Sequence, residues 1–330
     1  MPYLYTLVYT ADEKDVAEAE AWALLGNEAR GRKLVPAESC VDVRRAAHIG
    51  MCVRRMAGAD SFEALVPMVE ALHCHAEGFR ILVTKRGEAK RCGPGSDEIA
   101  HRLADAILGH PNLSAPRVLF ACLGDDGGWH FGRVESQTDR RWVGHSGKPH
   151  SFSNSLPSRL ARAMVNLVAR PGDTIVDPCC GAGTILIEAA SAGITAVGFD
   201  VNKQMASRAR ANLLHFGLRA LVGAGDARYL VGGYDAVVTD LPYGWTSAPD
   251  ASLYADILAN LRRLAPRLSI VVGSDASGAI AAAGWRIQRH ATQPKGLLCR
   301  HIYVCSADGL QPPPRMPRDP DHAPMSNESG

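Results

Sequence analysis

The second half of the chain alternates short apolar runs with amphipathic stretches. The apolar runs are rich in β-branched residues and predict strands at residues 174–178, 196–200, 220–226, 234–240 and 268–274. The stretches between them space their apolar residues as helices do, at residues 158–169, 185–192, 202–216 and 251–265. Such alternation favours an α/β fold with a mostly parallel sheet that is covered by helices on both faces. Residues 285–293 and 297–307 are expected to form a hairpin that closes the sheet.

The first half alternates strands and helices less regularly. Strands are predicted at residues 3–10, 79–85 and 117–124, and helices at residues 12–26, 61–73 and 96–108. We therefore predict an N-terminal α/β domain at residues 1–145, a polar linker at 146–157 and a second domain at 158–306. The remaining stretch, 307–330, is rich in proline and is expected to be disordered.

Composition narrows the class of protein without pointing to a partner. The chain is 46% hydrophobic and 21% charged, as in ordinary globular proteins, and carries a net charge of only +2. No apolar run approaches the roughly 18 residues that span a bilayer, and the N-terminus lacks a secretory signal pattern. Nine cysteines without metal-type spacing predict a reducing, cytoplasmic location and no metal site.

Acidic residues end three consecutive predicted strands of the second half. Asp177 opens the sequence DPCCGAG, and Asp200 and Asp226 end the next two strands. Because parallel strands end at one edge of the sheet, these acids should lie close together. Asp177 suits an ammonium group, and Asp200 can bind the two hydroxyls of a ribose. Asp226 can accept a hydrogen bond from the amine of an adenine. Together they predict a pocket for S-adenosylmethionine.

Neighbouring residues extend this predicted cofactor site. Gly181 and Gly183 should let a ligand approach the backbone closely, and we include Cys179, Val201 and Ala227 beside the acids. Each acid also has a structural alternative, as a turn former or a helix N-cap at a strand end. Cys179 and Cys180 are expected to be small buried residues rather than nucleophiles.

The sequence TDLPYG brings a fourth acid, Asp240, to the same edge. Methylation of an exocyclic amine on a base requires acceptors that hold its N–H groups, so that the nitrogen lone pair faces the methyl donor. Asp240 can supply one acceptor and the Leu241 carbonyl the other. Pro242 fixes the backbone without an N–H, and Tyr243 can stack on an extruded base. These four residues form the predicted catalytic loop.

Several of these stretches resemble a known family. DPCCGAGTILIEA, GFD, GAGDAR and TDLPYG are similar to the motifs of class I methyltransferases that act on amino groups. SFSNSLPSRLARAMVNLV resembles a helix that walls the cofactor pocket in the THUMP-domain RNA methyltransferases, and residues 78–108 resemble part of a THUMP domain. The resemblance covers roughly residues 1–306 and is best to the tRNA guanosine-10 N2-methyltransferases.

This resemblance implies a Rossmann-like, seven-stranded methyltransferase domain behind a THUMP-containing RNA-binding domain. It implies methylation of guanosine N2 in tRNA, with tRNA as partner and a small activating subunit as a further one. Leu241 stands where the family commonly has proline, which leaves another tRNA position or ribosomal RNA open, and a DNA amino-methyltransferase as a weaker alternative. Basic residues crowd one strand and loop of the first half and are the predicted RNA contacts: Arg80, Lys85, Arg86, Lys90 and Arg91.

Overall fold

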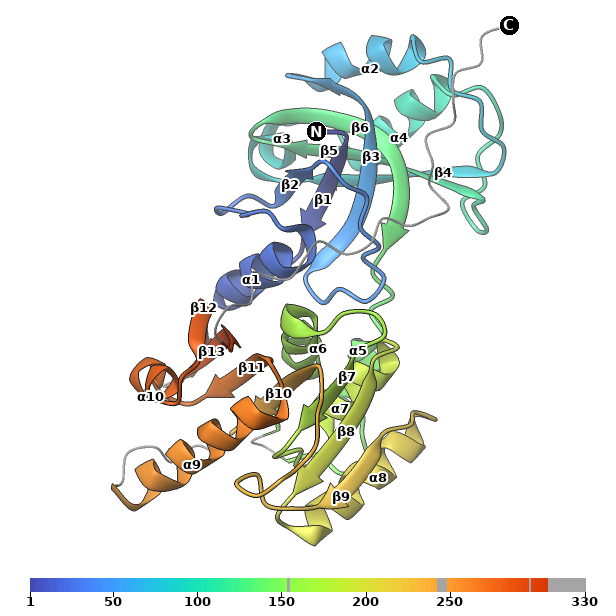
Figure 1. Cartoon of the computed structure of the whole chain (residues 1–330). Coiled ribbons are helices and arrows are strands. Elements are labelled where there is room, and N and C mark those ends of the chain that lie inside the picture. Colours follow the sequence, from blue (N-terminus) through green and yellow to red (C-terminus); the bar gives the residue numbers. More distant parts are fainter. Residues whose placement is uncertain (153–154, 242–247, 297, 308–330) are drawn as a thin grey trace, which may run out of the picture.

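Two β-sheets, one in each half of the chain, organise the protein (Figure 1). The computed structural model describes residues 1–152, 155–241, 248–296 and 298–307. The predicted Pro-rich tail, apart from its first residue, and the catalytic-loop residues Pro242 and Tyr243 lie outside this part of the chain.

The C-terminal sheet has seven strands in the order β12-β13-β11-β10-β7-β8-β9. Their bounds are β7 Thr174–Asp177, β8 Thr195–Asp200, β9 Leu221–Ala224, β10 Ala236–Asp240, β11 Arg267–Val272, β12 Arg286–Lys295 and β13 Leu298–Ser306. Neighbours from β9 to β11 are parallel, whereas β13 is antiparallel to both β11 and β12. The predicted α/β class and mostly parallel seven-stranded sheet are confirmed.

Helices cover both faces of this sheet. They are α6 Ser158–Val168, α7 Thr184–Ser191, α8 Lys203–His215, α9 Ala248–Leu264 and the short α10 Ser277–Ala282. Side chains of α6, α7 and α8 share one apolar core with Ile175 and Val238 of the sheet. Side chains of α9 pack with Val176 and Val237, which point to the opposite face. This alternation along each strand explains why the strands read as continuous apolar runs.

The N-terminal sheet has six strands in the order β2-β1-β3-β6-β5-β4. Its strands are β1 Tyr3–Leu7, β2 Leu34–Ala37, β3 Ile49–Ala59, β4 Phe79–Lys85, β5 Val118–Asp125 and β6 Gly128–Gln137. Its helices are η1 Ala11–Glu13, α1 Lys14–Leu25, α2 Phe62–Glu70, α3 Gly87–Cys92 and α4 Ser96–Asp105. Sequence patterning did not predict β2, β3 or β6. β3 is the longest of them and pairs with both β1 and β6.

Helix α1 of the first half packs against α6 of the second, between the two sheets (Figure 1). The α1 carboxylate of Glu20 is fully buried and accepts hydrogen bonds from Ala47 N at 2.8 Å, His48 N at 2.6 Å and Asn166 Nδ2 of α6 at 2.6 Å. Asp15 of α1 accepts from Thr292 Oγ1 of the sheet-edge strand β12 at 2.6 Å. The two halves are therefore joined by specific polar contacts, and α1 covers one edge of the C-terminal sheet.

The segment predicted as a polar linker is folded in part. It follows a short helix, α5 (Trp142–His145), and contains the buried Lys148 and Leu156. The buried side chain of Asn212 holds it against α8, because Asn212 Oδ1 accepts from His150 N and Asn212 Nδ2 donates to His150 O, both at 2.9 Å. Its polar composition thus reflects buried hydrogen bonds as well as exposure to water. None of the described helices combines the length and apolar character that a membrane span requires.

Candidate active site

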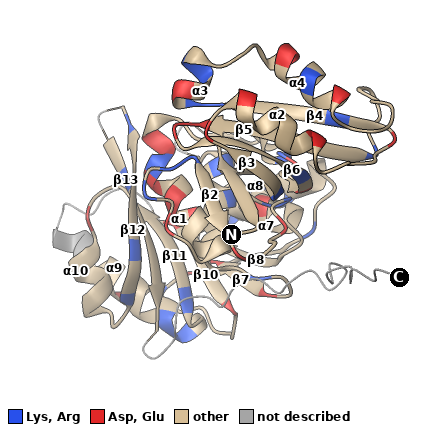
Figure 2. Cartoon of the chain, turned by 90° about the horizontal axis from the view of Figure 1, so that it is seen from above, with Lys and Arg blue, Asp and Glu red and all other residues tan. Residues whose placement is uncertain are grey.

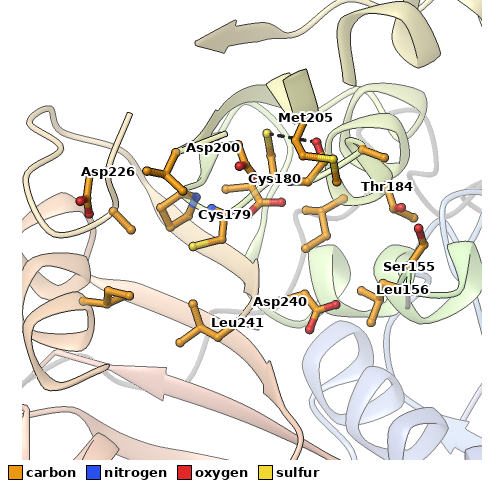
Figure 3. Close-up of a pocket in the computed structure, with 18 of the residues that line it drawn as sticks. Ser155, Leu156, Cys179, Cys180, Thr184, Asp200, Met205, Asp226, Asp240 and Leu241 are labelled. Atoms are coloured by element: carbon orange, nitrogen blue, oxygen red, sulfur yellow. Dashed lines mark hydrogen bonds between the residues drawn. The ribbon is translucent and has the colours of Figure 1, made fainter. Parts of the chain in front are cut away.

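A pocket of about 820 Å³ opens at the carboxyl ends of the parallel strands. It lies beside β7 and β10, where the strand order reverses, which is where ligands bind in open α/β sheets. Its volume suits a cofactor or a drug-sized ligand. The predicted site residues that line it are Asp177, Cys179, Gly181, Asp200, Val201, Asp226, Ala227, Asp240 and Leu241. Figure 3 shows Asp240 and Leu241 on one side of the pocket and Asp200 and Asp226 across it.

Asp177 is the most deeply buried acid of the pocket, with 1% of its surface exposed. Its Oδ1 accepts hydrogen bonds from Thr239 Oγ1 of β10 at 3.0 Å and from the backbone N of Cys179 at 3.2 Å. Burial raises the pKa of Asp177 to about 8, and the negative charges of Asp240 and Asp200 act in the same direction. An arriving cation would relieve that cost, so the position favours a positively charged ligand group.

Asp240 ends β10 and is half-buried. Burial raises its pKa to about 7, while the positive charges of Arg300 and Lys295 lower it. Its Oδ1 is buried without a hydrogen-bond partner among the described residues. A buried acceptor left open at the edge of a pocket is rare in folded proteins, so it is available to a ligand donor. The adjacent Leu241 is fully buried, and its N–H donates to Val271 O at 3.2 Å.

Asp200 organises the glycine-containing loop after β7. Its Oδ2 accepts from Gly181 N at 2.9 Å, and its Oδ1 accepts from Asn202 N at 2.8 Å. Gly181 has a positive φ of 51° and lines the pocket. Gly183, with a φ of 83°, does not line it: a Cβ there would lie 3.0 Å from the Ala209 Cβ of α8. Both glycines are therefore favoured by their backbone conformation, and Gly183 also by its close packing against α8.

Asp226 lies at the far end of the pocket and is engaged by Arg228. The Arg228 Nη2 donates to Asp226 Oδ2 at 2.6 Å, and its Nε lies 3.1 Å from both oxygens. These hydrogen bonds lower the pKa of Asp226, so the carboxylate stays ionised. Beside it, Ala227 is buried and Val201 of the pocket rim is 75% exposed.

The two adjacent cysteines do not have the character of nucleophiles. Cys179 and Cys180 both line the pocket, and burial together with the nearby acids raises the pKa of each thiol well above its usual range. A thiolate is the reactive form, so both are expected to remain inert at neutral pH.

Sequence reasoning missed the residues that enclose the pocket from the helices. Tyr254 and Ile257 of α9 and Met205 of α8 line it together with Phe152 and Leu156, which precede α6. Their sequence signal was that of ordinary helix core, apart from the resemblance of the SFSNSLPS stretch to a family wall element.

Among the five predicted RNA contacts, Arg80 lies apart from Lys85 and Arg86 along β4. Arg80 is the second residue of β4. Lys85 is its last residue, roughly 16 Å further along at about 3.3 Å per residue, and Arg86 follows it. Lys85 Nζ donates to Pro94 O, and Arg86 Nη2 donates to Leu7 O at 3.1 Å. Lys90 and Arg91 of α3 are exposed. Figure 2 shows basic and acidic segments interleaved over this half.

No group of three or more metal-type ligands lies together in the described ranges.

The second half of the chain is similar to known methyltransferases. The family described as UPF0020, RMKL-like methyltransferase domain, matches residues 148–278. The tRNA (guanine(10)-N2)-dimethyltransferase of Methanothermobacter thermautotrophicus is 45% identical over 101 residues, 29% of this chain and 30% of that one. The protein of the same name from Pyrococcus abyssi is 33% identical over 186 residues, 52% of this chain and 54% of that one. The chain thus spans about half or less of these two relatives.

A third relative is covered more fully. The probable tRNA (guanine(10)-N2)-dimethyltransferase of Methanothermococcus thermolithotrophicus is 31% identical over 115 residues, 31% of this chain and 70% of that one. Among solved structures, TrmN from Thermus thermophilus matches 92% of this chain and 99% of its own at 21% identity, with a TM-score of 0.48. The chain belongs, through its methyltransferase domain, to the family of the tRNA (guanine(10)-N2)-dimethyltransferases.

Proposed function

We propose that the protein transfers a methyl group from S-adenosylmethionine to the exocyclic N2 of a guanosine in tRNA. Guanosine 10 is the proposed target, because the relatives carry that position in their names. The observation that carries the proposal is the half-buried carboxylate of Asp240, whose buried Oδ1 has no partner among the described residues, in the pocket that Asp177 also lines. It is the acceptor that an amine substrate needs, next to an acid suited to a cationic cofactor.

The pocket residues fit S-adenosylmethionine. We assign the buried Asp177 to the ammonium group and Asp200, at the end of the next strand, to the ribose hydroxyls. Asp226 lines the pocket together with the apolar Ala227 and Ile257, a setting suited to the adenine ring and its amine. When bound, the cofactor supplies an electrophilic methyl group, whose bond to sulfur breaks as the amine nitrogen bonds to its carbon.

The chain's own residues orient the amine. Asp240 accepts one N–H of the exocyclic nitrogen, and the Leu241 carbonyl accepts the other, so the lone pair points at the methyl carbon. The product nitrogen is briefly positive and loses its proton to the Asp240 carboxylate, from which water removes it. Pro242 and Tyr243 keep their proposed roles in shaping the loop and stacking on the extruded base.

The N-terminal domain would hold the RNA. Its strand and helix order and the exposed Lys90 and Arg91 support a THUMP-like module that contacts phosphates, with the target base extruded toward the pocket. A small activating subunit remains a further proposed partner, and a cytoplasmic setting suits a tRNA substrate.

The test is direct. The protein is incubated with unfractionated tRNA and labelled S-adenosylmethionine, and the digested nucleosides are separated by mass spectrometry. N2-methylguanosine or N2,N2-dimethylguanosine is expected, and RNase mapping then gives its position. Asp240→Ala should lose turnover by about 10²-fold or more while it binds the cofactor nearly as tightly. Label in any other nucleoside would overturn the proposal.

Leu241 favours one second candidate. Leu241 stands where the resembled family commonly has proline, which leaves other tRNA positions and ribosomal RNA open, so the same assay is run with ribosomal RNA. A DNA amino-methyltransferase would instead prefer duplex DNA over tRNA.

A further inference from the structure

Arg300 lies on the same face of the C-terminal sheet as Asp240. Asp240 is paired with Val271 of β11, and Val271 is paired with Ile302 of β13. Paired residues of neighbouring strands point to one face, and so do residues two apart along a strand. Arg300, two residues before Ile302, therefore points to the face that carries Asp240 and lies toward the same edge.

The Arg300 side chain is removed from water. Only 4% of its surface is exposed, and its cross-strand neighbour Gln293 is 8% exposed. Arg300 Nη1 lies 3.4 Å from Gln293 Oε1. A buried guanidinium is costly unless acceptors or an anion compensate it. Gln293 is one acceptor beside Arg300, and the positive charge of Arg300 lowers the pKa of Asp240.

The other charged groups around Asp240 come from three elements. Lys295 of β12 lies on the same face as Gln293 but is partly exposed, so water screens its charge. Asp177 of β7 lines the same pocket, and the proposed cofactor ammonium would compensate its negative charge. Arg162 of α6 is engaged by Glu188 at 2.9 Å. Of the two cations that lower the pKa of Asp240, Arg300 is the buried one.

The charge of Asp240 decides which base edge it matches. A carboxylate is an acceptor only, whereas a carboxylic acid also carries a donor. Guanine places the N1–H donor beside its N2 amine, so one carboxylate can accept from both. Adenine and cytosine place an unprotonated ring nitrogen beside their amine, and its lone pair would face the second oxygen. The anion therefore matches guanine, and the protonated acid matches the other two.

Resting on the proposed function, we propose that Arg300 is a positioning residue that keeps Asp240 in its acceptor-only carboxylate form. We further propose that this form selects guanine at the target position by accepting from both N1–H and N2–H.

The first experiment measures single-turnover methylation of tRNA by the full chain from about pH 6 to about pH 9. The wild type should lose rate as pH falls through about 7, the pKa of Asp240. Arg300→Gln, which keeps a polar group for Gln293, and Arg300→Met should move this limb upward by about one pH unit. The methylation rate of these variants should therefore be roughly tenfold below that of the wild type at low pH and equal to it at high pH. Arg300→Lys should stay close to the wild type.

Arg286→Met is the matched control, because Arg286 is exposed and pairs with Ser306 at the opposite end of the same hairpin. Its profile should equal that of the wild type. A rate loss in Arg300→Gln that is uniform across pH would show a structural role and overturn the proposal, as would an unmoved limb. If Arg300→Met does not fold, Arg300→Gln and Arg300→Lys still decide between these outcomes.

The second experiment replaces the mapped target guanine with 2-aminopurine, which keeps the amine but has no N1–H. The wild type should methylate guanine about 10²-fold faster or more, because 2-aminopurine turns a lone pair toward the anion. Asp240→Asn, which carries a donor, should reduce this preference at least about tenfold whatever its overall rate. Equal rates on guanine and 2-aminopurine in the wild type would contradict selection of guanine through its N1–H. Absence of N2-methylguanosine from every wild-type reaction would instead sink the proposed function itself.

Discussion

Thr239 Oγ1 donates a hydrogen bond of 3.0 Å to Asp177 Oδ1, and this bond joins β10 to β7. The two strands meet where the order of the sheet reverses, so the bond crosses the base of the pocket. Both side chains are buried, and the donor stabilises the ionised acid, which lowers the pKa of Asp177. The strand that presents Asp240 therefore also tunes the acid that we assign to the cofactor ammonium.

Thr239→Val keeps the side-chain shape but removes that donor. The pKa of Asp177 should rise further, so the affinity for S-adenosylmethionine near pH 7 should fall several-fold and recover as the pH rises. Isothermal titration calorimetry at two pH values checks this. Ser269→Ala is the control, because the Ser269 hydroxyl is buried in the same sheet without a partner among the described residues, and its loss should leave the affinity unchanged.

Asp177→Asn should stabilise the protein at high pH while it weakens cofactor binding. The pKa of Asp177 is raised to about 8, so the folded chain keeps a proton that the unfolded chain releases near pH 4. The free energy of unfolding that this group contributes therefore declines as the pH rises between those values. The gain in melting temperature from Asp177→Asn should be larger at about pH 8 than at about pH 5. An equal gain at both pH values would show that Asp177 is not protonated in the folded state.

The sequence predicted the C-terminal half well because its central parallel strands β7, β10 and β11 are buried apolar runs. Such runs are short and bounded by acids or glycines, so they cannot be mistaken for amphipathic helices. β3 escaped prediction because Arg54, Arg55 and two glycines interrupt its apolar positions. This segment becomes a strand because it pairs with β1 on one side and with β6 on the other. Tertiary pairing, which local patterning does not contain, forms that strand.

The convergence of the four acids could be predicted for a simple reason: parallel strands of one sheet end at a common edge. The position of Arg300 could not. It lies sixty residues after Asp240 in a hairpin whose pattern predicts only strand, and its burial follows from the register with β12. The bond between Asp226 and Arg228 also went unpredicted, since two residues at this spacing meet only in the turn that follows β9.

Glu20→Gln should test how firmly the two halves are joined. The Glu20 carboxylate accepts three hydrogen bonds in a fully buried position. In the glutamine variant one carboxylate oxygen becomes an NH2 group, which would face at least one of these N–H groups and could not accept from it. A loss of about 2–4 kcal/mol in the free energy of unfolding is expected. Thermal unfolding checks this, with Asp15→Asn as the exposed comparison on the same helix. Equal melting temperatures for the two variants would show that the buried contact contributes little.

Charge reversal of Lys90 and Arg91 should weaken tRNA binding without disturbing the fold. Both side chains are exposed on α3, whereas Lys85 and Arg86 also bond to backbone carbonyls and would lose structure if reversed. If both contact phosphates, the slope of log affinity against log salt should fall by about 1.4–1.8, at about 0.7–0.9 per contact. Filter binding at several salt concentrations measures that slope. Arg263→Glu combined with Arg286→Glu changes the net charge equally on the other half of the chain, and it should leave the slope nearly unchanged. If both double variants reduced the slope alike, the RNA would be attracted by overall charge, and the surface at α3 would not be its binding site.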